Sequence, residues 1–581
     1  MSARELTILI IGGYGSFGGR LAHLLADVES LTLLIAGRSR AKAADFCAEF
    51  RGRARVIPQA FDRNGDVEAQ LRENAPHLIV DVSGPFQSYG EDRYSLVKAA
   101  IAAGIDYIDF ADGSEFVKGI GRFDREAKAR GIFVLSGVST FPVLTAAVVK
   151  ELAKDMTNIE AVTGGIAPSP DAGVGLSVMR AIAGYAGKPL SLVRDGARAV
   201  SYALTETRRY TIAPPGRLPL PNMLFSLVDV PDLKVLPELW PSIRSVWIGA
   251  GPIPQFLHRA LIGLAWMVRL GVLPTLAPLA GLMYRAVNRL ARGEHRSGMF
   301  ISVEGTNPAG ERSKRSWHLV AEGKDGPFIP SMAAEAIVRR CLDGRRPDAG
   351  ARAAAGVLDL DAYRELFARR AIYSGFRERM PSAGSWPLYR RLLGDAWNDL
   401  PIQLREMHTL QAGLTARGMA TVERGPSGLA RMAASLLGFP EEGREIPIEV
   451  HFTAENGRET WVRSFAGSRL ATVQMEGEGR SERLLCERFG PIVFAIAVVL
   501  DGGRLKFMVR GWSLFGVPMP VGLAPLGNAY EHVNDGRFGF DVDIGHRWLG
   551  RIVRYRGWLV PERVEVGLRV GRSAAFSLIV P

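Results

Sequence analysis

The stretch ILIIGGYGSFGGRLAHLL, residues 8–25, decides the fold of the first part of the chain. A short apolar run, of the kind that forms a buried parallel strand, leads directly into a glycine-rich loop, and leucines at helical spacing follow. Strand, glycine loop and helix in this order form the unit that binds the pyrophosphate of a dinucleotide. The sequence therefore predicts a dinucleotide-binding loop close to its start.

Each glycine of the pattern Gly13-x-Gly15-x-x-Gly18 has a physical task. The first permits a tight turn, the second lets the backbone approach the phosphates, and the third lets the helix pack closely on the strand. The helix that begins here offers free N–H groups and the positive end of its dipole to an anion. We therefore expect Gly13, Gly15, Ser16, Phe17 and Gly18 to line the cofactor site.

The end of the next apolar run, LTLLIAGRSR at residues 31–40, indicates which dinucleotide binds. An NAD site usually has Asp or Glu here, hydrogen-bonded to the ribose hydroxyls. This chain has Arg38 and Ser39 instead, and a guanidinium can hold a 2′-phosphate that a carboxylate would repel. A solvated arginine at the end of a strand is the alternative. The pattern favours NADP(H) as the cofactor.

Strands and helices continue to alternate through about residue 150. Buried-type apolar runs separated by helical segments such as YSLVKAAIAAG predict a doubly wound parallel sheet, whose ligands bind beyond the carboxyl ends of the strands. Asp62 follows the third strand, either as a contact to the adenine edge or as a cap of its own loop. Ser83, Gly84 and Pro85 follow the fourth strand, and we expect them near the nicotinamide half of the cofactor.

Several segments together resemble the saccharopine dehydrogenase-like oxidoreductases. They are GGYGSFG, AGRSR, VDVSGPFQSYG with AAIAAGIDYIDFADG, and SGVSTFPVLTAAVV. A looser resemblance appears at GPFIPSMAAEAIVRRCLDG, residues 326–344, where chains of this family return to the nucleotide domain. The resemblance implies a Rossmann-like dinucleotide-binding domain over residues 1–150, with return helices at about 327–375. It does not identify the substrate.

No catalytic residue is assigned from these patterns. Several relatives have a glutamate after YxDx(S/T)G, whereas this chain has Asp112 and Glu115 nearby without matching the motif. Tyr94 and Lys98 spell the Tyr-x-x-x-Lys pair of short-chain dehydrogenases. That pair lies later in its own family, after a fifth strand, so an ordinary helix start is favoured here.

Residues 151–326 have a different pattern. Segments such as IEAVTGGIAP and RSVWIGAG alternate like antiparallel strands, and GMFISVEGTN with RSWHLVAEGK predicts a hairpin. We expect an α+β substrate domain with a mostly antiparallel sheet. In the family resembled, such a domain covers the nicotinamide and holds the substrate. His318 and Tyr210 could exchange protons there, although structural roles are favoured.

The substrate domain contains an apolar helical insertion at residues 252–296. Neither of its uncharged stretches reaches the 18 residues expected of a spanning helix. Its last helix has two faces, with Arg285, Arg289 and Arg292 on one and Leu282, Met283, Ala286 and Leu290 on the other. A basic amphipathic helix beside an apolar one is typical of an interfacial membrane anchor. A buried helical lid with a solvated arginine edge is the alternative.

A linker near residue 380 precedes a strand-rich segment at 385–581. Asn456-Gly457 and Asp501-Gly502-Gly503 are hairpin-turn sequences. The segment resembles a C-terminal domain of unknown function that accompanies such dehydrogenase-like chains. We predict a β-rich domain that either holds a lipid on an apolar inner face or serves as a structural or dimerising module.

Composition excludes several classes of protein. The 581 residues are 47% hydrophobic and 23% charged, which is typical of several globular domains and not of a disordered chain. Three distant cysteines and isolated histidines lack metal-ligand spacing, so we predict no metal and a reducing, cytoplasmic setting. The net charge of +12 comes without a nucleic-acid-binding motif, so an anionic cofactor or membrane is favoured over nucleic acid.

Two functions follow from these observations. The first is an NADP-dependent oxidoreductase that transfers hydride to or from an apolar or membrane-borne small molecule. We expect it in the cytoplasm or peripherally on the inner membrane face, with a homodimer as its candidate assembly. The second is a membrane-associated lipid-binding or scaffold protein that keeps a nucleotide fold without turnover. The intact glycines and Arg38 favour the first, while the lack of an assigned proton donor keeps the second open.

Overall fold

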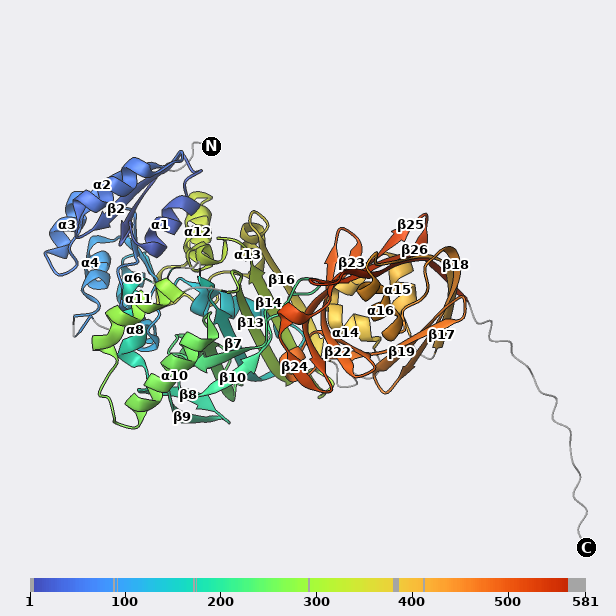
Figure 1. Cartoon of the computed structure of the whole chain (residues 1–581). Helices are drawn as coiled ribbons and strands as arrows, with labels where there is room; N and C mark the ends of the chain where they lie inside the picture. The colour runs from blue at the N-terminus through green and yellow to red at the C-terminus, as the bar shows by residue number, and fades with distance from the viewer. Residues whose placement is uncertain are drawn as a thin grey trace, which may run out of the picture. The chain divides into compact units, whose positions relative to one another are not determined.

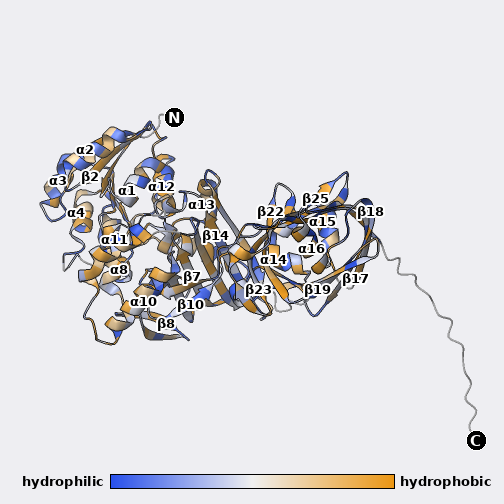
Figure 2. Ribbon diagram, in the orientation of Figure 1, coloured by the Kyte–Doolittle hydropathy of each residue, from blue (hydrophilic) through white to orange (hydrophobic). Residues whose placement is uncertain are grey.

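The chain forms two compact units, Met1–Ala383 and Gly384–Pro581 (Figure 1). The computed structural model describes residues 5–86, 89–90, 92–170, 173, 175–290, 293–379, 386–410 and 413–562. In Figure 2 the strands of the first sheet are largely apolar, whereas the helices beside them alternate between apolar and polar faces. Each unit has hydrophobic clusters of its own.

The first sheet is parallel, with seven strands in the order β15-β6-β5-β4-β1-β2-β3. Its strands are Leu6–Ile11 (β1), Leu31–Gly37 (β2), Arg55–Ala60 (β3), Leu78–Asp81 (β4), Asp106–Asp109 (β5), Phe133–Ser136 (β6) and Gly350–Ala353 (β15). The strand order reverses between β1 and β4, which is where ligands bind in sheets of this type. The predicted doubly wound parallel sheet is confirmed.

Helices cover both faces of this sheet. They are Ser16–Leu24 (α1), Arg40–Glu49 (α2), Val67–Asn74 (α3), Ser95–Ala103 (α4), Ser114–Gly119 (α5), Asp124–Ala129 (α6), Thr145–Leu152 (α7), Ile329–Leu342 (α12) and Leu360–Phe367 (α13). Alternate residues of β1 enter two separate cores: Ile8 and Ile10 pack with α1 and α12, and Leu9 and Ile11 with α4 and α5. All four side chains are at most 2% exposed, so β1 is buried on both faces, as its continuous apolar run predicts.

A second sheet of seven strands follows in the same unit, in the order β10-β11-β12-β7-β13-β14-β16. Its strands are Asn158–Ala167 (β7), Thr207–Tyr210 (β10), Met223–Leu227 (β11), Ser245–Ala250 (β12), Ser297–Thr306 (β13), Arg312–Ala321 (β14) and Ile372–Arg379 (β16). All neighbouring pairs are antiparallel except β7 with β12. The mostly antiparallel sheet and the β13–β14 hairpin are therefore confirmed.

Four helices and a small hairpin accompany the second sheet. They are Leu176–Tyr185 (α8), Asp232–Leu239 (α9), Gln255–Arg269 (α10) and Ala280–Leu290 (α11), with Pro189–Arg194 (β8) paired to Ala197–Tyr202 (β9). The insertion at residues 252–296 contributes α10 and α11. Across the described part of the chain, no helix combines the length and the hydropathy needed to cross a membrane.

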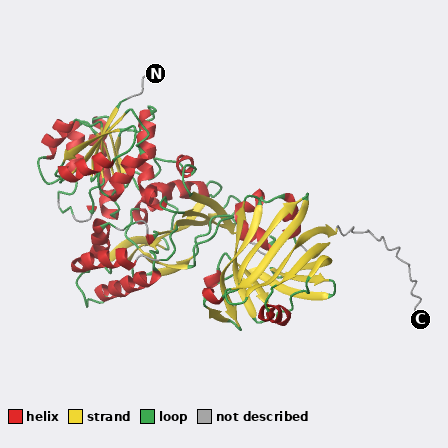
Figure 3. Cartoon of the chain, turned by 45° about the horizontal axis from the view of Figure 1, so that its top comes forward, coloured by secondary structure: helices red, strands yellow, loops and turns green. Residues whose placement is uncertain are grey.

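The second unit is built on an antiparallel sheet that closes into a barrel of ten strands, because β22 also pairs with β23 (Figure 3). The barrel strands are Gly413–Arg424 (β17), Gly443–Glu455 (β18), Arg458–Phe465 (β19), Ser468–Glu476 (β20), Leu485–Phe489 (β21), Ile492–Asp501 (β22), Arg504–Leu514 (β23), Leu526–Asn534 (β25), Arg537–His546 (β26) and Gly550–Glu562 (β27), and Val517–Met519 (β24) extends β23. Asn456 and Gly457 adopt φ values of 51° and 74° between β18 and β19, which confirms that hairpin. The predicted β-rich C-terminal domain is confirmed.

The inner face of the barrel packs against helices of the same unit. Leu388–Leu393 (α14) and Ile402–His408 (α15) place apolar side chains against the strands, while Gly428–Leu436 (α16) joins β17 to β18. Tyr389, Leu404 and Met407 are completely buried against strand residues such as Phe452 and Leu485. The apolar inner face that we expected is thus covered by the chain's own helices.

Candidate functional site

The glycine loop lies at the carboxyl end of β1, where the strand order reverses. Gly12, with φ of 84°, makes the left-handed turn, so the tight turn falls one residue before Gly13, to which the sequence pattern assigned it. Gly13 is required for a different reason, because a Cβ there would lie 2.8 Å from the carbonyl oxygen of Ile10. A Cβ on Gly18 would lie 2.5 Å from the carbonyl oxygen of Gly12, so the third glycine is required by close packing of the helix on the loop.

Gly15 differs from Gly13 and Gly18 because the space beside it is less crowded. It directly precedes α1, and a Cβ built on it would meet the carbonyl oxygen of Gly12 at 3.0 Å and no other atom closer than 4.0 Å. The first-turn N–H groups of a helix have no partners within the helix and attract anions. An open cradle beside these N–H groups fits the pyrophosphate of a dinucleotide, and Ser16 and Phe17 are the first residues of that turn.

The Ser83-Gly84-Pro85 loop lies directly against the glycine loop. A Cβ on Gly12 would meet the Cα of Ser83 at 3.3 Å. Asp81 holds this loop, because its Oδ1 accepts hydrogen bonds from the N–H of Ser83 at 3.0 Å and from its hydroxyl at 2.5 Å. Two segments some 70 residues apart in sequence therefore meet at one edge of the sheet, as the parallel topology predicts.

Residues at the ends of β2 and β3 lie at the same carboxyl edge. Arg38 is exposed, and no carboxylate of the described part of the chain pairs with it. Ser39 caps the start of α2, because its hydroxyl accepts a hydrogen bond from the N–H of Lys42 at 3.3 Å. Asp62 caps its own loop by accepting from the N–H two residues later at 3.0 Å. The cap is thus observed, and a contact of Asp62 with adenine stays a prediction.

Two buried carboxyl groups end β4 and β5. Asp81 forms an ion pair with the Arg63 guanidinium. Asp109 accepts hydrogen bonds from the N–H of Gly137 at 2.8 Å and from the hydroxyl of Ser136 at 2.9 Å, and burial raises the pKa of Asp109 to about 7. Neither group was recognised from the sequence, although each is the last residue of its strand. They fix the loops from which the site is built.

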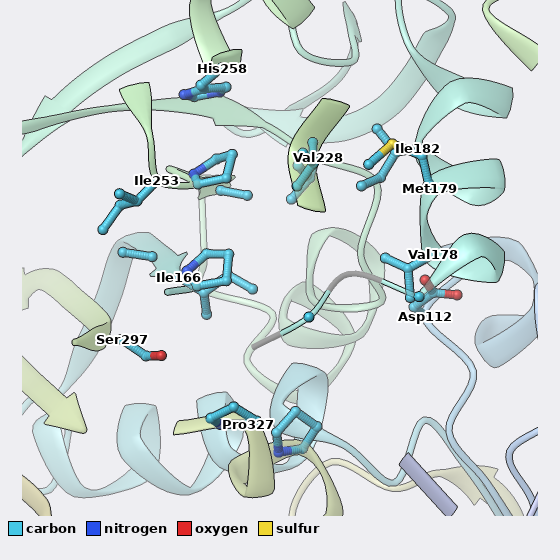
Figure 4. Close-up of a pocket in the computed structure, with 18 of the residues that line it drawn as sticks. Asp112, Ile166, Val178, Met179, Ile182, Val228, Ile253, His258, Ser297 and Pro327 are labelled. Carbon is cyan, nitrogen blue, oxygen red and sulfur yellow. The ribbon is translucent and has the colours of Figure 1, made fainter. Parts of the chain in front are cut away.

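A cavity of about 560 Å³ opens between α1 and the helices of the second sheet. Ser16, Phe17 and Arg20 of α1 form one wall, directly after the glycine loop. The other walls are mainly apolar and include Ile166, Met179, Ile182, Val228 and Ile253 (Figure 4). Met283 of α11 also lines the cavity. The structure therefore places an apolar chamber beside the predicted cofactor loop.

Among the described residues that line the cavity, few can exchange protons. They are Asp112, Tyr185, Asp229 and His258. Burial lowers the pKa of His258 to about 4, so its ring is neutral at pH 7. Its Nε2 is hydrogen-bonded to the Ser226 hydroxyl at 2.7 Å. Burial, with the nearby carboxylates of Asp112 and Asp229, raises the pKa of Tyr185, and burial also raises that of Asp229. Tyr185 is therefore protonated at neutral pH.

Sequence reasoning did not find Tyr185 or Asp229. The segment LSVMRAIAGY has apolar residues at helical spacing and could have identified α8 as an amphipathic helix, with Tyr185 at its end. Asp229 stands between two valines, and its burial depends on contacts with residues distant in sequence.

The other proton-exchanging residues considered from the sequence do not line the cavity. The Tyr94 hydroxyl donates to the carbonyl of Phe116 at 2.8 Å, inside the first domain. His318 is buried within the second sheet, where its Nδ1 accepts from the N–H of Ala213 at 3.2 Å, and Tyr210 stacks on Phe300 with ring centres 3.6 Å apart. These contacts are structural. Of the two carboxylates near the family motif, Asp112 lines the cavity, whereas Glu115 pairs with Lys234.

The inner faces of α10 and α11 line the cavity. The residues involved are Leu257, Leu261 and Leu264 of α10 and Met283, Ala286 and Val287 of α11. Arg285 and Arg289 are exposed on the other face of α11, while Arg292 lies outside the described residues. Of the apolar face of α11, Met283 and Ala286 line the cavity, whereas Leu290 is 47% exposed and Leu282, at the cavity's border, is 65% exposed. The membrane anchor and the lid therefore both stay predictions.

Two family models match the chain. Residues 8–135 match the saccharopine dehydrogenase NADP binding domain, and residues 400–559 match DUF4166, a domain of unknown function. No protein with curated annotation matches. The chain therefore carries an NAD(P)-binding dehydrogenase fold of the saccharopine dehydrogenase type, which implies a nicotinamide cofactor, together with a C-terminal DUF4166 domain.

Solved structures similar to the chain include apo saccharopine dehydrogenase (L-Glu forming) from Saccharomyces cerevisiae, at 14% identity and a TM-score of 0.46, covering 64% of this chain and 100% of that one. The WlbA dehydrogenase from Thermus thermophilus, in complex with NAD and alpha-ketoglutarate, shares 13% identity with a TM-score of 0.27 over 59% of this chain and 90% of its own. Biliverdin reductase from Synechocystis, in complex with biliverdin and NADP+, shares 10% identity with a TM-score of 0.28 over 62% and 94%.

Proposed function

We propose that this chain is an NADP(H)-dependent oxidoreductase that acts on an apolar small molecule held in the cavity beside α1. The observation that carries the proposal is the position of the cavity. Ser16 and Phe17, which begin the helix after the glycine loop, form one of its walls, and apolar side chains of the second sheet and its helices form most of the rest. A molecule in this cavity would lie next to the predicted cofactor loop.

The residues present fit the dinucleotide. The open cradle at Gly15 would hold the pyrophosphate, Arg38 the 2′-phosphate and the Ser83 loop the nicotinamide half. The nicotinamide, when bound, supplies the hydride acceptor or donor. We infer NADP(H) over NAD(H) because Arg38 is exposed and no carboxylate of the described chain pairs with it.

The chain's own residues perform two tasks in this proposal. The apolar walls exclude water and favour a substrate with little charge, because a polar group buried there would lose its hydrogen bonds to water. Tyr185 is the proposed proton donor, because it lines the cavity and carries a hydroxyl that is protonated at neutral pH.

Ligand binding tests the proposal without knowledge of the natural substrate. Wild-type protein should bind NADPH in calorimetry and should bind an apolar fluorescent probe such as a naphthalene sulfonate. Ala286→Trp places an indole in the cavity and should weaken probe binding at least tenfold while leaving NADPH affinity unchanged. Asn288→Trp, on the exposed face of the same helix, is the matched control.

The outcomes separate the two functions considered. If the wild type binds the probe but not NADPH, the chain is the lipid-binding or scaffold protein and not an oxidoreductase. If both tryptophan variants bind the probe like the wild type, the cavity is not the binding site. The homodimer and the role of the barrel stay predictions.

A further inference from the structure

The outer face of α10 presents large apolar side chains to solvent. One stripe of the helix carries residues spaced by three, seven and four positions, namely the apolar Phe256, Trp266 and Leu270 together with Arg259. Phe256 is 58% exposed and Leu270 is 70% exposed, and Val272 in the following turn is 63% exposed. Apolar side chains gathered on one helix face and the adjoining turn indicate an interaction surface.

The charge around this stripe has a single sign. Residues 252–293 contain five arginines and no aspartate or glutamate. Arg259, Arg285 and Arg289 are exposed, and within the described chain no carboxylate pairs with any of them. Arginines elsewhere in this unit, such as Arg194 and Arg339, do form ion pairs. The surface therefore combines apolar side chains with uncompensated positive charge.

The same two helices form part of the cavity wall. The inner faces of α10 and α11 contribute Leu261, Leu264, Met283 and Val287 to the apolar lining. An apolar molecule reaching the cavity through this wall would pass from one apolar environment to another without crossing water.

We propose that α10, the turn at residues 270–273 and α11 dock on an anionic bilayer surface and that the apolar substrate enters from there. Phe256, Leu270 and Val272 insert at the acyl boundary, and the arginines contact anionic headgroups. The route of the substrate rests on the proposed function, whereas the docking itself does not. The chain would then be a peripheral protein of the inner membrane face.

Vesicle flotation of the full chain tests the docking. The wild type should float with vesicles of phosphatidylcholine mixed with phosphatidylglycerol, but not with phosphatidylcholine alone, and high salt should release it. Each arginine near an anionic surface contributes about 1 kcal/mol, or about fivefold in affinity, so Arg259→Glu/Arg285→Glu/Arg289→Glu should weaken binding by roughly a hundredfold or more. Phe256→Ser/Leu270→Ser/Val272→Ser should weaken it at least tenfold.

A matched control comes from α16 in the second unit, which also exposes an apolar stripe. Leu429, Met432 and Leu436 are 62%, 64% and 86% exposed, and their replacement by serine should leave flotation unchanged. Circular dichroism and NADPH titration show that each variant is folded, and the titration tests the proposed function separately from docking. The proposal is overturned if the wild type does not float with anionic vesicles, if the α10 and arginine variants float like the wild type, or if the α16 variant is the one that loses binding.

Discussion

Asp109→Asn should flatten the pH dependence of stability in the first unit. Oδ1 of Asp109 accepts hydrogen bonds from the N–H groups of Ala111 and Gly137 and from the hydroxyl of Ser136, at 2.8 to 2.9 Å. Its Oδ2 is buried and has no hydrogen-bond partner in the described part of the chain. An asparagine amide keeps an oxygen for the three donors and carries no charge.

The magnitude follows from the pKa of Asp109, which burial raises from the ordinary 3.8 to about 7. Between these two values the folded state holds a proton that the unfolded state has lost, so the free energy of unfolding falls as pH rises. Each pKa unit is worth about 1.4 kcal/mol, so from pH 5 to pH 8 this group removes about 3 kcal/mol of stability from the wild type. The asparagine variant loses none of this, although its buried amide N–H₂ costs about 1–3 kcal/mol at every pH.

Urea unfolding of both proteins at pH 5 and pH 8, followed by circular dichroism, measures the difference. Protease cleavage identifies which transition belongs to the first unit. Burial also raises the pKa of Asp232 to about 7 and lowers that of His258. Both groups are present in wild type and variant, so their contributions to the pH dependence of stability cancel in the comparison. Asp81→Asn is the contrasting control, because it breaks the buried pair with Arg63 and should destabilise the unit at both pH values. Equal pH slopes in wild type and Asp109→Asn would refute the reasoning.

Four substitutions test the cofactor and substrate residues. Arg38→Ala should reduce NADPH affinity about tenfold or more, because a charge-assisted hydrogen bond is worth roughly 1.5–3 kcal/mol, and should leave NADH affinity unchanged. Calorimetry with both cofactors measures this, and equal NADPH affinities in wild type and variant would exclude the contact. Gly15→Val should abolish NADPH binding and cost less stability than Gly18→Val, because the Cβ of residue 15 would lie 3.0 Å from the Gly12 oxygen and that of residue 18 only 2.5 Å. Unchanged NADPH binding by the Gly15 variant would show that the glycines only turn the chain. Tyr185→Phe should leave NADPH and probe affinity unchanged but slow turnover of any carbonyl substrate at least a hundredfold, measured as NADPH oxidation. Full activity in the variant would show that another group donates the proton.

Local patterns were enough to predict the elements whose structure depends on neighbouring residues. The strand, glycine loop and helix around Gly15 and the turn at Asn456-Gly457 are encoded within a few positions, because backbone conformation and hydrogen bonding are decided there. Tyr185 and Asp109 could not be recognised in this way. Their altered pKa values come from burial by segments distant in sequence.

The helix α11 shows a second limit of sequence patterns. Amphipathic spacing identified the apolar face that contains Met283 and Ala286, but the same spacing results whether a bilayer or the protein's own cavity covers that face. The structure assigns these two residues to the cavity. Exposed apolar side chains lie on α11 at Leu282 and Leu290, and also on α10 and the turn after it, which the sequence analysis did not single out.

The packing of α12 on α1 has a consequence for the synthesis of the chain. The hydroxyl of Ser331 donates to the carbonyl oxygen of Phe17 at 3.1 Å, which joins the first turn after the glycine loop to a helix made more than 300 residues later. A ribosome therefore completes the entire second sheet except β16 before α12 can reach α1. The nascent chain would acquire a finished cofactor loop only after residue 342 has emerged, and a fragment ending at residue 150 would carry every glycine of the motif without the helix that supports it.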